Sequence, residues 1–385
     1  LRSRGSLQEG VNLDNGGILQ VTVNKEVSNV ASNLLFLDRN DNLIISTALY
    51  VKDKYLDTKV VLVYMDANVR IKADSVGLNA ENFETGTVNF EELYTGCMIK
   101  ELPDDEFEAL KDKPSIPNNF DNLYPNQFVR FTKKSDPSIS HTMRYIHSSN
   151  TLIPFKYYRG QEVFGIKSRN YEQEMALELL LDDNIKLVSL SGIAGTGKTL
   201  LAIAAGLQKV IEENKYARLV ISRPIFPLGK DLGYLPGSKT EKFNPWMQPI
   251  YDNMDILLSH HDQVGPTNPK NKRKTSIDDF MDYGYVELEP LTYIRGRSLP
   301  DQFMIIDEAQ NLTPHEMKTI ITRAGENTKI VLTGDPYQID IPYLDSSSNG
   351  LSVAVEKLKV EDIVGHITLI KGERSALADL AAKYF

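Results

Sequence analysis

Short apolar runs that end in polar or glycine residues recur through the second half of the chain. Three of them, at 187–190, 303–306 and 330–333, have the length and composition of buried strands. Continuous apolar strands of this kind are typical of parallel sheets that helices cover on both faces. Helical patterns at 175–181 and 200–207 stand on either side of the first run. This alternation predicts an α/β fold for this part of the chain.

The first part of the chain has an α/β pattern of its own. An alternating stretch at 18–23 and a continuous apolar stretch at 59–65 predict strands. Between them, residues 41–49 predict a helix with its apolar residues on one side. We therefore expect a separate α/β domain over residues 1–94.

Two acidic residues of this first domain are candidate metal ligands. Asp41 stands at the start of the predicted helix, and Asp66 directly follows the predicted strand at 59–65. Functional side chains gather at the carboxyl ends of strands in α/β sheets, and paired carboxylates are ligands that Mg²⁺ or Mn²⁺ prefers. The alternative is that Asp41 caps its helix and Asp66 is a loop residue. The spacing alone favours this alternative.

The middle of the chain, residues 95–165, changes in character. Its first part is acidic, whereas over 125–160 six lysines and arginines stand against one aspartate. Stretches at 128–132 and 141–146 predict strands, with a turn at 148–150. We expect a small β-rich domain here.

Two interpretations of the basic stretch remain open. The cations are Arg130, Lys133, Lys134, Arg144, Lys156 and Arg159, and the interleaved aromatic residues are Phe128, Phe131, Tyr145, Phe155, Tyr157 and Tyr158. Basic and aromatic side chains together suit single-stranded nucleic acid, because bases stack on rings and the backbone follows the positive charge. The alternative is a small barrel with an aromatic core and solvated lysines.

A glycine-rich motif connects the strand at 187–190 to the helical pattern at 200–207. It reads Gly192-Ile193-Ala194-Gly195-Thr196-Gly197-Lys198-Thr199 and matches the phosphate-binding loop G-x-x-x-x-G-K-[ST]. The glycines let backbone N–H groups turn toward an anion, and the next helix adds its N-terminal dipole. We expect Lys198 to reach the β- and γ-phosphates of ATP and Thr199 to offer its hydroxyl to Mg²⁺.

The other two buried strands end in residues that suit ATP hydrolysis. The run at 303–306 leads into Asp307-Glu308-Ala309-Gln310, and the run at 330–333 leads into Gly334-Asp335-Pro336-Tyr337-Gln338. We expect Asp307 to hold the magnesium shell and Glu308 to orient and polarise the attacking water. Gln338 is expected to bond the γ-phosphate and report its loss. The alternative for 334–336 is a simple turn.

Several arginines and one amide are candidates for further contacts with ATP or RNA. Gln173 can donate to and accept from the edge of adenine at once, unless Arg169-Asn170 before it only caps a helix. An arginine finger, worth about 10³–10⁵ in rate, is expected from Arg374 first, then Arg323. Arg223 is a third candidate that could equally contact nucleic acid. Each arginine has the alternative of a surface ion pair.

Two basic stretches between these motifs are further candidates for RNA contacts. The loop at 267–275 and the Arg295-Gly296-Arg297 segment would suit RNA phosphates, although charge runs are more often simply solvated.

Composition narrows the class of protein. A net charge of −9 requires any nucleic-acid surface to be a local patch. The single cysteine excludes an internal disulfide framework and fits a reducing cytoplasm. No apolar run approaches the ~18 residues of a membrane helix. We expect a cytoplasmic protein without membrane contact.

The motifs resemble known families. The ordered set formed by the phosphate loop, 307–310 and 334–338 resembles a superfamily 1 helicase core, and the segment before the loop that holds Gln173 resembles the adenine-reading segment of many helicases. The segments 222–237, 245–253 and 371–375 resemble the PhoH-like ATPases. The segments 40–44 and 63–66 resemble the later half of a PIN nuclease domain. Together they resemble the PIN–PhoH fusion.

The resemblance implies three domains and two activities. It implies a PIN-like nuclease domain over 1–94, a small β-rich domain over 95–165 and a RecA-like P-loop ATPase over 166–385. In the PIN pattern Asp41 and Asp66 match two metal-binding acids, whereas two earlier acids have no counterpart here. Because the chain also lacks an initial methionine, we expect this domain to be incomplete at its N-terminus and to cleave RNA poorly.

The expected function is therefore an ATP-dependent RNA helicase coupled to a ribonuclease that uses Mg²⁺ or Mn²⁺. The resemblance further implies ATP and Mg²⁺ as cofactors, single-stranded RNA as a partner, and a homo-oligomeric ring, expected to be a hexamer. The alternative function is a nucleotide-dependent regulatory or assembly ATPase that does not process RNA. A metabolic kinase fits less well, because the acids at 307–308 suit attack by water.

Overall fold

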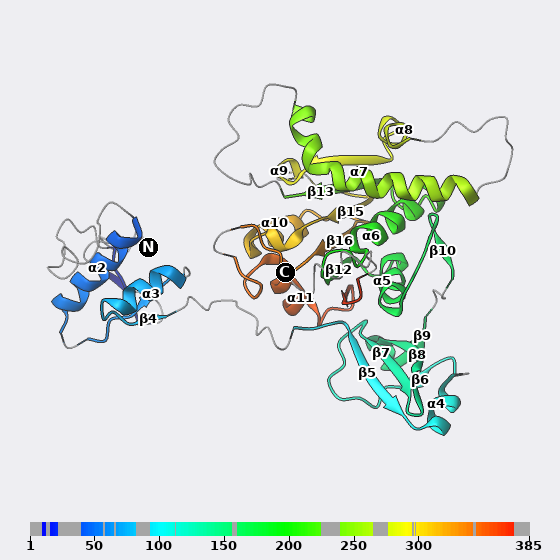
Figure 1. Ribbon diagram of the computed structural model, residues 1–385, viewed down its shortest axis with the longest axis horizontal. Coiled ribbons are helices and arrows are strands. Elements are labelled where there is room, and N and C mark those ends of the chain that lie inside the picture. Colours follow the sequence, from blue (N-terminus) through cyan, green and yellow to red (C-terminus); the bar gives the residue numbers. More distant parts are fainter. Residues whose placement is uncertain are drawn as a thin grey trace. The chain divides into compact units, whose positions relative to one another are not determined.

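The chain forms two compact units, Leu1–Thr85 and Gly86–Phe385, and each has hydrophobic cores of its own. The structure is a computed structural model. It describes residues 10–12, 16–21, 40–56, 58–64, 67–81, 93–111, 113–155, 160–224, 239–264, 276–294, 296, 298–341 and 344–372 (Figure 1).

The described residues of the first unit form two helices and two short strand pairs. The helices are α2 (Asn40–Lys54) and α3 (Ala67–Ser75), β1 (Val11–Asn12) pairs antiparallel with β2 (Ile18–Leu19), and β3 (Leu62–Val63) pairs parallel with β4 (Ala80–Glu81). The predicted helix at 41–49 is confirmed and longer than expected. Its buried face is narrower than predicted, because Ile45 and Leu49 are buried whereas Leu43 and Ile44 lie in contact with solvent.

The two strands predicted in this unit are shorter than the sequence pattern suggested. The prediction at 18–23 is borne out only at Ile18–Leu19, and the prediction at 59–65 only at Leu62–Val63. Each of these strands pairs over two residues, so the ladder supports no longer strand among the described residues. Residues 22–23 and 65–66 lie outside the described part of the chain.

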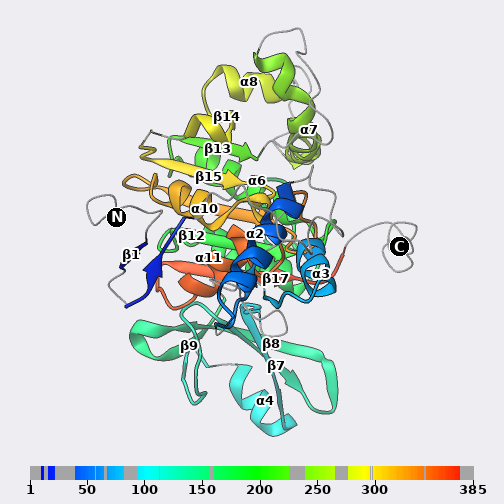
Figure 2. The same ribbon diagram turned by 90° about the vertical axis from the view of Figure 1, so that its left-hand side faces the viewer.

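A six-stranded parallel sheet forms the centre of the second unit. Its strands are β12 (Leu187–Gly192), β13 (Arg218–Arg223), β14 (Val286–Pro290), β15 (Gln302–Ile306), β16 (Lys329–Gly334) and β17 (Val364–Leu369). They run in the order β14-β13-β15-β16-β12-β17, with every pair parallel. In Figure 2, β14, β13, β15, β12 and β17 follow one another down the picture. The strands predicted at 187–190, 303–306 and 330–333 are therefore confirmed as neighbours or near neighbours in one sheet.

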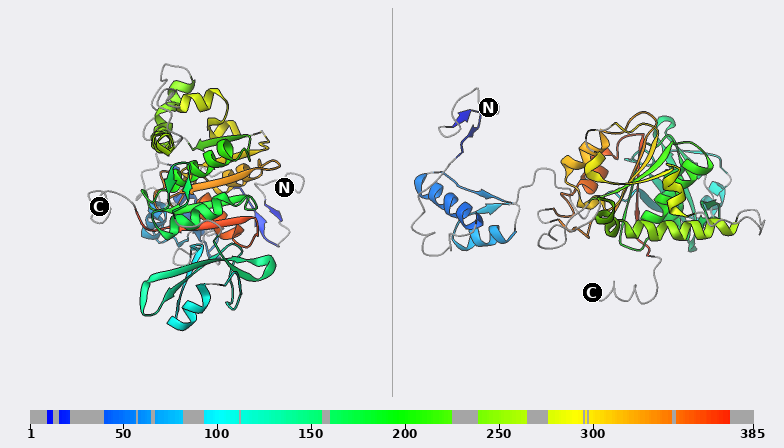
Figure 3. Two further views of the ribbon diagram at one scale, coloured as in Figure 1. Left: turned by 90° about the vertical axis from the view of Figure 1, so that its right-hand side faces the viewer. Right: turned by 90° about the horizontal axis from the view of Figure 1, so that it is seen from above.

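Helices cover both faces of this sheet, as its apolar strands predict. One core contains residues of α5 (Tyr171–Leu181), α6 (Lys198–Leu207) and α7 (Lys239–Val264), and it also takes in Ile277 of α8 (Ile277–Asp282). The other contains residues of α9 (Leu291–Ile294), α10 (Pro314–Ile321) and α11 (Gly350–Leu358). Within β15, Phe303 and Ile305 face the first core, and Met304 and Ile306 face the second. Figure 3 shows α7 as the long yellow-green helix along one side of this unit.

Short helical segments extend two of these elements. The π-helical turn η4 (Gln208–Glu212) continues α6, and the 3-10 turn η5 (Ala309–Asn311) follows β15 after two residues. Both keep the chain close to the sheet, and η5 starts directly behind the predicted catalytic acids.

A smaller five-stranded sheet precedes the large one in the second unit. Its strands are β5 (Cys97–Leu102), β6 (Ile116–Pro117), β7 (Phe128–Lys133), β8 (Asp136–Ile146) and β9 (Thr151–Pro154), in the order β5-β7-β8-β9-β6. The helix α4 (Asp104–Lys111) packs on it, η3 (His147–Ser149) gives the predicted turn, and a hairpin of β10 (Glu162–Val163) and β11 (Ile166–Lys167) leads on to α5. The small β-rich region is thus present.

Polar contacts fasten the small sheet to the large one. The Asn126 side chain donates from Nδ2 to the carbonyls of Asp362 and Val364, at 2.8 and 2.9 Å. On the other side, Arg144 of β8 donates to Asp182 just after α5, with 2.6 Å between Nη2 and Oδ2. The small sheet is therefore joined by polar contacts to the residues before and in β17 and to the end of α5.

Candidate active site

The glycine-rich motif forms a tight loop between the end of β12 and the start of α6. A Cβ atom at Gly192 would lie 2.0 Å from the carbonyl oxygen of Leu369, so only glycine allows this approach of β12 to β17. Gly197 has a φ of +91° and is the residue from which α6 starts. The first backbone N–H groups of this ten-residue helix have no acceptor within the helix, an arrangement that suits an anion. The predicted residues Ile193, Ala194, Gly195 and Thr196 complete the loop.

Lys198 folds back onto the loop that it follows. Its Nζ donates to the carbonyl oxygens of Gly192 and Ile193, at 2.7 and 2.9 Å. The hydroxyl of the buried Thr196 donates to the same Ile193 carbonyl at 3.0 Å. The ammonium group is thus held inside the curve of the loop, where it would meet the phosphates of a bound nucleotide.

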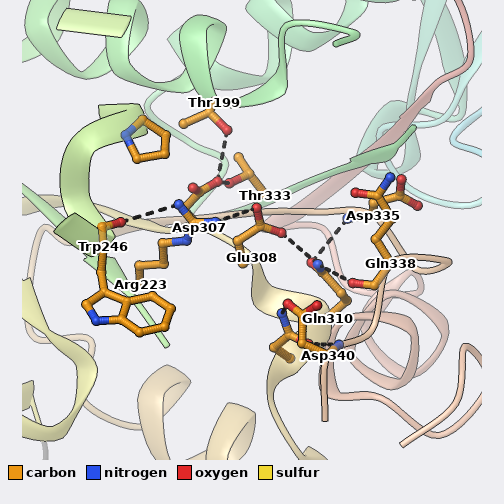
Figure 4. A network of polar contacts seen from close by, with 12 residues as sticks. Thr199, Arg223, Trp246, Asp307, Glu308, Gln310, Thr333, Asp335, Gln338 and Asp340 are labelled. Atoms are coloured by element: carbon orange, nitrogen blue, oxygen red, sulfur yellow. Dashed lines mark hydrogen bonds and ion pairs between the residues drawn. The ribbon is translucent and has the colours of Figure 1, made fainter. Parts of the chain in front are cut away.

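Asp307 joins the phosphate loop to two strands of the sheet. Its Oδ1 accepts from the Thr199 hydroxyl at 2.8 Å and from the Thr333 hydroxyl at 2.7 Å. Asp307 is 5% exposed and lies at the end of β15, directly beside β16 and one strand away from β12 (Figure 4). One carboxylate and two hydroxyls are hard oxygen donors, and this donor set fits Mg²⁺, which keeps several of its waters.

Glu308 follows in a backbone conformation that few residues adopt. Its φ is +52°, in the left-handed region, where strain is usually found at functional sites. Its Oε1 lies 2.9 Å from Nη2 of Arg223, and its Oε2 accepts from Nε2 of Gln310 at 2.7 Å. The side chain is one-third exposed, so it can reach solvent from the edge of the sheet.

Gln310 is the residue that the sequence interpretation left without a role. It is almost fully buried, and its Nε2 donates to Glu308 and also to the backbone carbonyl of Gln338, at 2.8 Å. Its Oε1 accepts from the N–H of Asp335 at 3.1 Å. Gln310 therefore links the predicted base to the segment after β16. The only sequence signal was its place in the motif at 307–310.

Gln338 reaches this network through its backbone. Its carbonyl accepts from Gln310, while its side chain is exposed. Asn311 adds a second link to the same segment, because its amide donates to the Asp340 carboxylate at 3.0 Å and accepts from the Asp340 N–H at 2.8 Å. The segment 335–340 is thus tied to the residues that follow Glu308.

Gln173 is held between the phosphate loop and the residues before α5. Its Nε2 donates to the Thr196 carbonyl at 3.1 Å, and its Oε1 accepts from the Arg169 N–H at 2.8 Å. Asn170 is the N-cap residue of α5, as the alternative interpretation proposed, and it accepts from the Gln173 N–H. Both ends of the predicted adenine-reading amide are therefore engaged within the protein.

The neighbouring Glu172 has a comparable role that the sequence did not indicate. Its buried carboxylate accepts from the N–H groups of Ile370 and Lys371 at 2.7 and 3.0 Å, and so fixes the chain that leaves β17. Next to it, the guanidinium of Arg130 stacks on the ring of Tyr171 at 3.7 Å from its centroid. Burial raises the pKa of the Tyr171 hydroxyl. The start of α5 is thus a junction of the loop, β17 and the small sheet.

Two of the three candidate arginines are described, and they lie at opposite edges of the large sheet. Arg223 ends β13 beside Glu308. Arg323 lies at the opposite edge of the sheet, because its carbonyl accepts from the N–H of Leu299, which precedes β15. Arg374 lies outside the described residues.

The two acids of the PIN-like region are only partly described. Asp41 stands in the first turn of α2 and is half-buried, whereas Asp66 lies outside the described residues. Within the described part of the chain, no group of three or more His, Cys, Asp or Glu side chains is arranged to hold a metal ion. Residues 267–275, Arg295 and Arg297 are also outside it.

Several of the aromatic and basic side chains of the small sheet make structural contacts. Phe128, Phe131 and Tyr145 are buried, Phe128 in the core around α5 and α6 and the other two in the core of the small sheet. Lys133 pairs with Glu108 at 3.0 Å and lies near Asp104, and Arg144 is buried with Asp182. These three rings are therefore core residues, as the aromatic-core interpretation expected, and their burial leaves no ring face open for a base to stack on. The described residues do not include Lys156, Tyr157, Tyr158 and Arg159.

Comparisons with known proteins cover nearly the whole chain. The family model described as PhoH-like protein matches residues 165–382, and a PIN domain model matches residues 3–84. Protein PhoH2 of Bacillus subtilis (strain 168) is 44% identical over 391 residues, which cover 99% of this chain and 86% of that protein. Protein PhoH2 of Thermobispora bispora is 34% identical over 376 residues, with coverages of 95% and 79%.

The likeness to solved structures is distant. The Pif1 helicase from Candida albicans is 15% identical, with 57% of this chain and 44% of that chain covered, and its TM-score of 0.30 is too low to support an argument. Among the described residues, no helix has the length and apolar character needed to cross a membrane.

Proposed function

Because this chain belongs to the PhoH-like family and carries an N-terminal PIN domain, we propose that it is an ATP-dependent RNA helicase coupled to a metal-dependent ribonuclease. Membership in a family of P-loop ATPases supports the hydrolase part. The single observation that carries the proposal is the meeting of Thr199 and Thr333 on Asp307, one residue before Glu308.

The proposed roles follow from this geometry. The loop 192–199 and Lys198 would bind the triphosphate, and Thr199 with Asp307 would hold Mg²⁺, which neutralises developing phosphate charge. Glu308 would orient and polarise the attacking water. Gln338 would respond to the γ-phosphate together with Gln310, since the carbonyl of Gln338 accepts from the amide that also holds Glu308.

The RNA part of the proposal rests on the PIN domain and on the helicase-like order of motifs. Asp41 and Asp66 are the proposed ligands of a Mg²⁺ or Mn²⁺ ion that activates water for RNA cleavage. We propose a PIN-like domain over 1–94, a small β-rich domain over 95–165, and the ATPase over 166–385. A homo-oligomeric ring, with six subunits as the expected number, would let a neighbouring subunit complete each site.

One observation favours the second candidate function, a regulatory or assembly ATPase that does not process RNA. Three rings of the small sheet that were candidates for RNA contacts are buried, Arg144 is buried with Asp182, and Lys133 is paired with Glu108 at the surface. If the remaining basic segments also fail to bind RNA, the ATPase would act on a protein partner.

Turnover of ATP with and without single-stranded RNA tests the proposal. We expect RNA to raise turnover severalfold, and strand separation of an RNA duplex with a single-stranded tail to require ATP. The Lys198→Ala variant is the control, because loss of its ammonium should weaken nucleotide binding and remove both effects. If RNA leaves the rate of ATP turnover unchanged and no strand separation occurs, the regulatory or assembly function would be supported instead.

A further inference from the structure

The carboxylate of Glu308 is occupied from two sides. Figure 4 shows Arg223 and Trp246 on one side of it and Gln310 on the other. Nη2 of Arg223 lies 2.9 Å from Oε1, and Nε2 of Gln310 lies 2.7 Å from Oε2. A second nitrogen of Arg223 makes a long hydrogen bond of 3.4 Å to the carbonyl of Trp246 in α7. Glu308 is thus held in a defined position by donors on both oxygens.

This pairing follows from the order of the strands. β13 and β15 are parallel neighbours, with Ser222 opposite Ile306, and the N–H of Asp307 donates to the Ser222 carbonyl at 2.9 Å. Arg223, Asp307 and Glu308 therefore lie side by side at the carboxyl edge of the sheet. The ion pair is a product of the register.

Arg223 approaches Glu308 from the side away from the nucleotide loop. In the order β14-β13-β15-β16-β12-β17, the phosphate loop follows β12, whereas Arg223 ends the strand on the other side of β15. An anion could therefore reach Arg223 from the β13 and α7 side while nucleotide occupies the loop. The Arg223 side chain is 20% exposed, which leaves part of it open to solvent.

The chemistry of an arginine determines what could release this contact. A guanidinium keeps its charge at every accessible pH, so protonation does not break the pair. Its planar set of donors matches the oxygens of a phosphate group, which can compete with a carboxylate. Each carboxylate oxygen can accept a further hydrogen bond, so the two donors do not exclude a water. They do fix the direction of the carboxylate, and the guanidinium charge competes with the water for Oε1.

We propose that Arg223 is a positioning residue that restrains Glu308 until a backbone phosphate of single-stranded RNA binds its guanidinium and frees the carboxylate. This inference rests on the proposed function, because it assigns the partner and the regulation of the same site. It places the RNA strand at the carboxyl ends of β13 and β15. It also makes ATP hydrolysis slow in the absence of RNA for a structural reason.

Steady-state ATP turnover of the full chain, with and without single-stranded RNA, tests the inference in Arg223→Met. The thioether keeps the length of the side chain but removes the charge. We expect turnover without RNA to rise about three- to tenfold, as for loss of a partly exposed ion pair. The ratio of turnover with RNA to turnover without RNA should fall toward one. The KM for ATP should stay within about twofold of that of the original chain, because Arg223 lies away from the phosphate loop.

Two further variants separate positioning from general stability. Arg223→Lys keeps a positive charge and should retain most of the stimulation by RNA. Arg218→Met is the matched control: Arg218 begins the same strand and pairs with Glu287 across to β14 at 3.0 Å, far from the acids. Its turnover and stimulation should match those of the original chain.

Two results would overturn the inference. A fall of about a hundredfold or more in the turnover of Arg223→Met would make Arg223 a contact of the transferred phosphate. Turnover without RNA that equals that of the original chain would show that the ion pair restrains nothing. A chain that does not hydrolyse ATP at all contradicts the proposed function and the inference together, whereas these two results contradict the inference alone.

Discussion

A fully buried lysine binds the backbone carbonyls at the C-terminal end of α5, the helix that carries Gln173. Lys329 is the first residue of β16, and its Nζ donates to the carbonyls of Leu179 and Asp182, at 2.9 and 2.8 Å. These are acceptors that the end of α5 leaves without a helical donor. Burial lowers the pKa of Lys329 to about 7, although the charges of Asp182 and Asp183 oppose the shift.

The pKa of Lys329 predicts a pH dependence of stability. Because its value in the folded chain lies below the ordinary 10.5 of the unfolded chain, the unfolded state binds more protons between about pH 7 and 10.5. The contribution of Lys329 to the free energy of unfolding should therefore rise with pH across this interval. We expect the difference in unfolding free energy between the original chain and Lys329→Met to grow from pH 7 to 9 in urea titrations.

An exposed lysine provides the control for this measurement. Lys357→Met on α11 removes a lysine from the surface of the same unit. We expect the difference in unfolding free energy between Lys357→Met and the original chain to change little with pH. If the difference for Lys329→Met is equally independent of pH, burial does not lower the pKa of Lys329.

At the residue scale, motifs with fixed internal spacing could be predicted and tertiary partners could not. Thr199 and Asp307 were assigned to one ion from the sequence, and their side chains meet in the structure. Gln310 stood in the same motif, but its role depends on contacts with Asp335 and Gln338, which come from a different strand. Nothing in the spacing of the motif indicates which strand will lie beside it.

At the scale of elements, the strand β8 is joined to α5 through buried charges. Arg144 is 3% exposed, and its guanidinium lies 2.6 Å from the Asp182 carboxylate and 3.7 Å from that of Glu178. Leaving a buried charge without its partner costs more than the pair itself contributes. This contact therefore holds the small sheet to the helix that supports the phosphate loop.

The Arg144→Met variant should be strongly destabilised. Removing the guanidinium leaves two carboxylates near each other in a mostly buried place, which should cost about 3–5 kcal/mol of unfolding free energy. The comparison is Lys133→Met in the neighbouring strand, whose pairs with Glu108 and Asp104 lie at the surface. Titration with guanidinium chloride should give almost the same unfolding free energy for Lys133→Met as for the original chain. Equal unfolding free energies of the two variants would contradict the assigned role of Arg144.

The elements that the sequence predicted well are those with a continuous apolar pattern. The strands at 187–190, 303–306 and 330–333 were confirmed because both faces of each are buried, so every position is apolar or small. The pattern at 59–65 looked the same, yet only Leu62–Val63 is a strand, and Val63 is 49% exposed. An apolar run indicates burial, but strand length depends on a partner strand that the run does not reveal.

At the scale of the whole molecule, the candidate arginines raise the question of a second subunit. Arg323 stands at the amino edge of the sheet, opposite the edge that carries Glu308. It cannot serve its own site from there, whereas an arginine of a neighbouring subunit could, if subunits pack with opposite edges together. We propose the same for Arg374, the first candidate for the arginine finger: it would act in the site of a neighbouring subunit.

Mixing of inactive variants should reveal such sharing. Lys198→Ala keeps its arginines, and Arg374→Ala or Arg323→Ala keeps its phosphate loop. Each alone should lose turnover, by about 10³ for the true finger. We expect a mixture of Lys198→Ala with the finger variant to regain a substantial part of the turnover, measured after subunit exchange.

The matched control is a mixture of Lys198→Ala with Glu308→Gln. Both changes damage the nucleotide site of their own subunit, so no combination restores a complete site. Recovery in this control, or none in the test mixture for either arginine, would contradict a site shared between subunits.

The whole-molecule prediction from sequence succeeded in fold class more than in arrangement. The α/β class followed from the motifs. The domain bounds near residues 94 and 165 stay predictions, and the chain forms two compact units that meet at Thr85–Gly86. The order of strands did not follow, because parallel strands of similar composition give no sign of their neighbours. For the same reason, the sequence offered three arginines and could not place Arg223 beside Glu308.

Single-turnover hydrolysis of ATP by Glu308→Gln tests the proposed base, because it separates nucleotide binding from the chemical step. The amide keeps the size of the side chain but loses the carboxylate, so ATP should bind with unchanged affinity while hydrolysis slows by about a hundredfold or more. The surface variant Glu326→Gln should behave as the original chain does. Hydrolysis by Glu308→Gln at the original rate would contradict the assignment of this site.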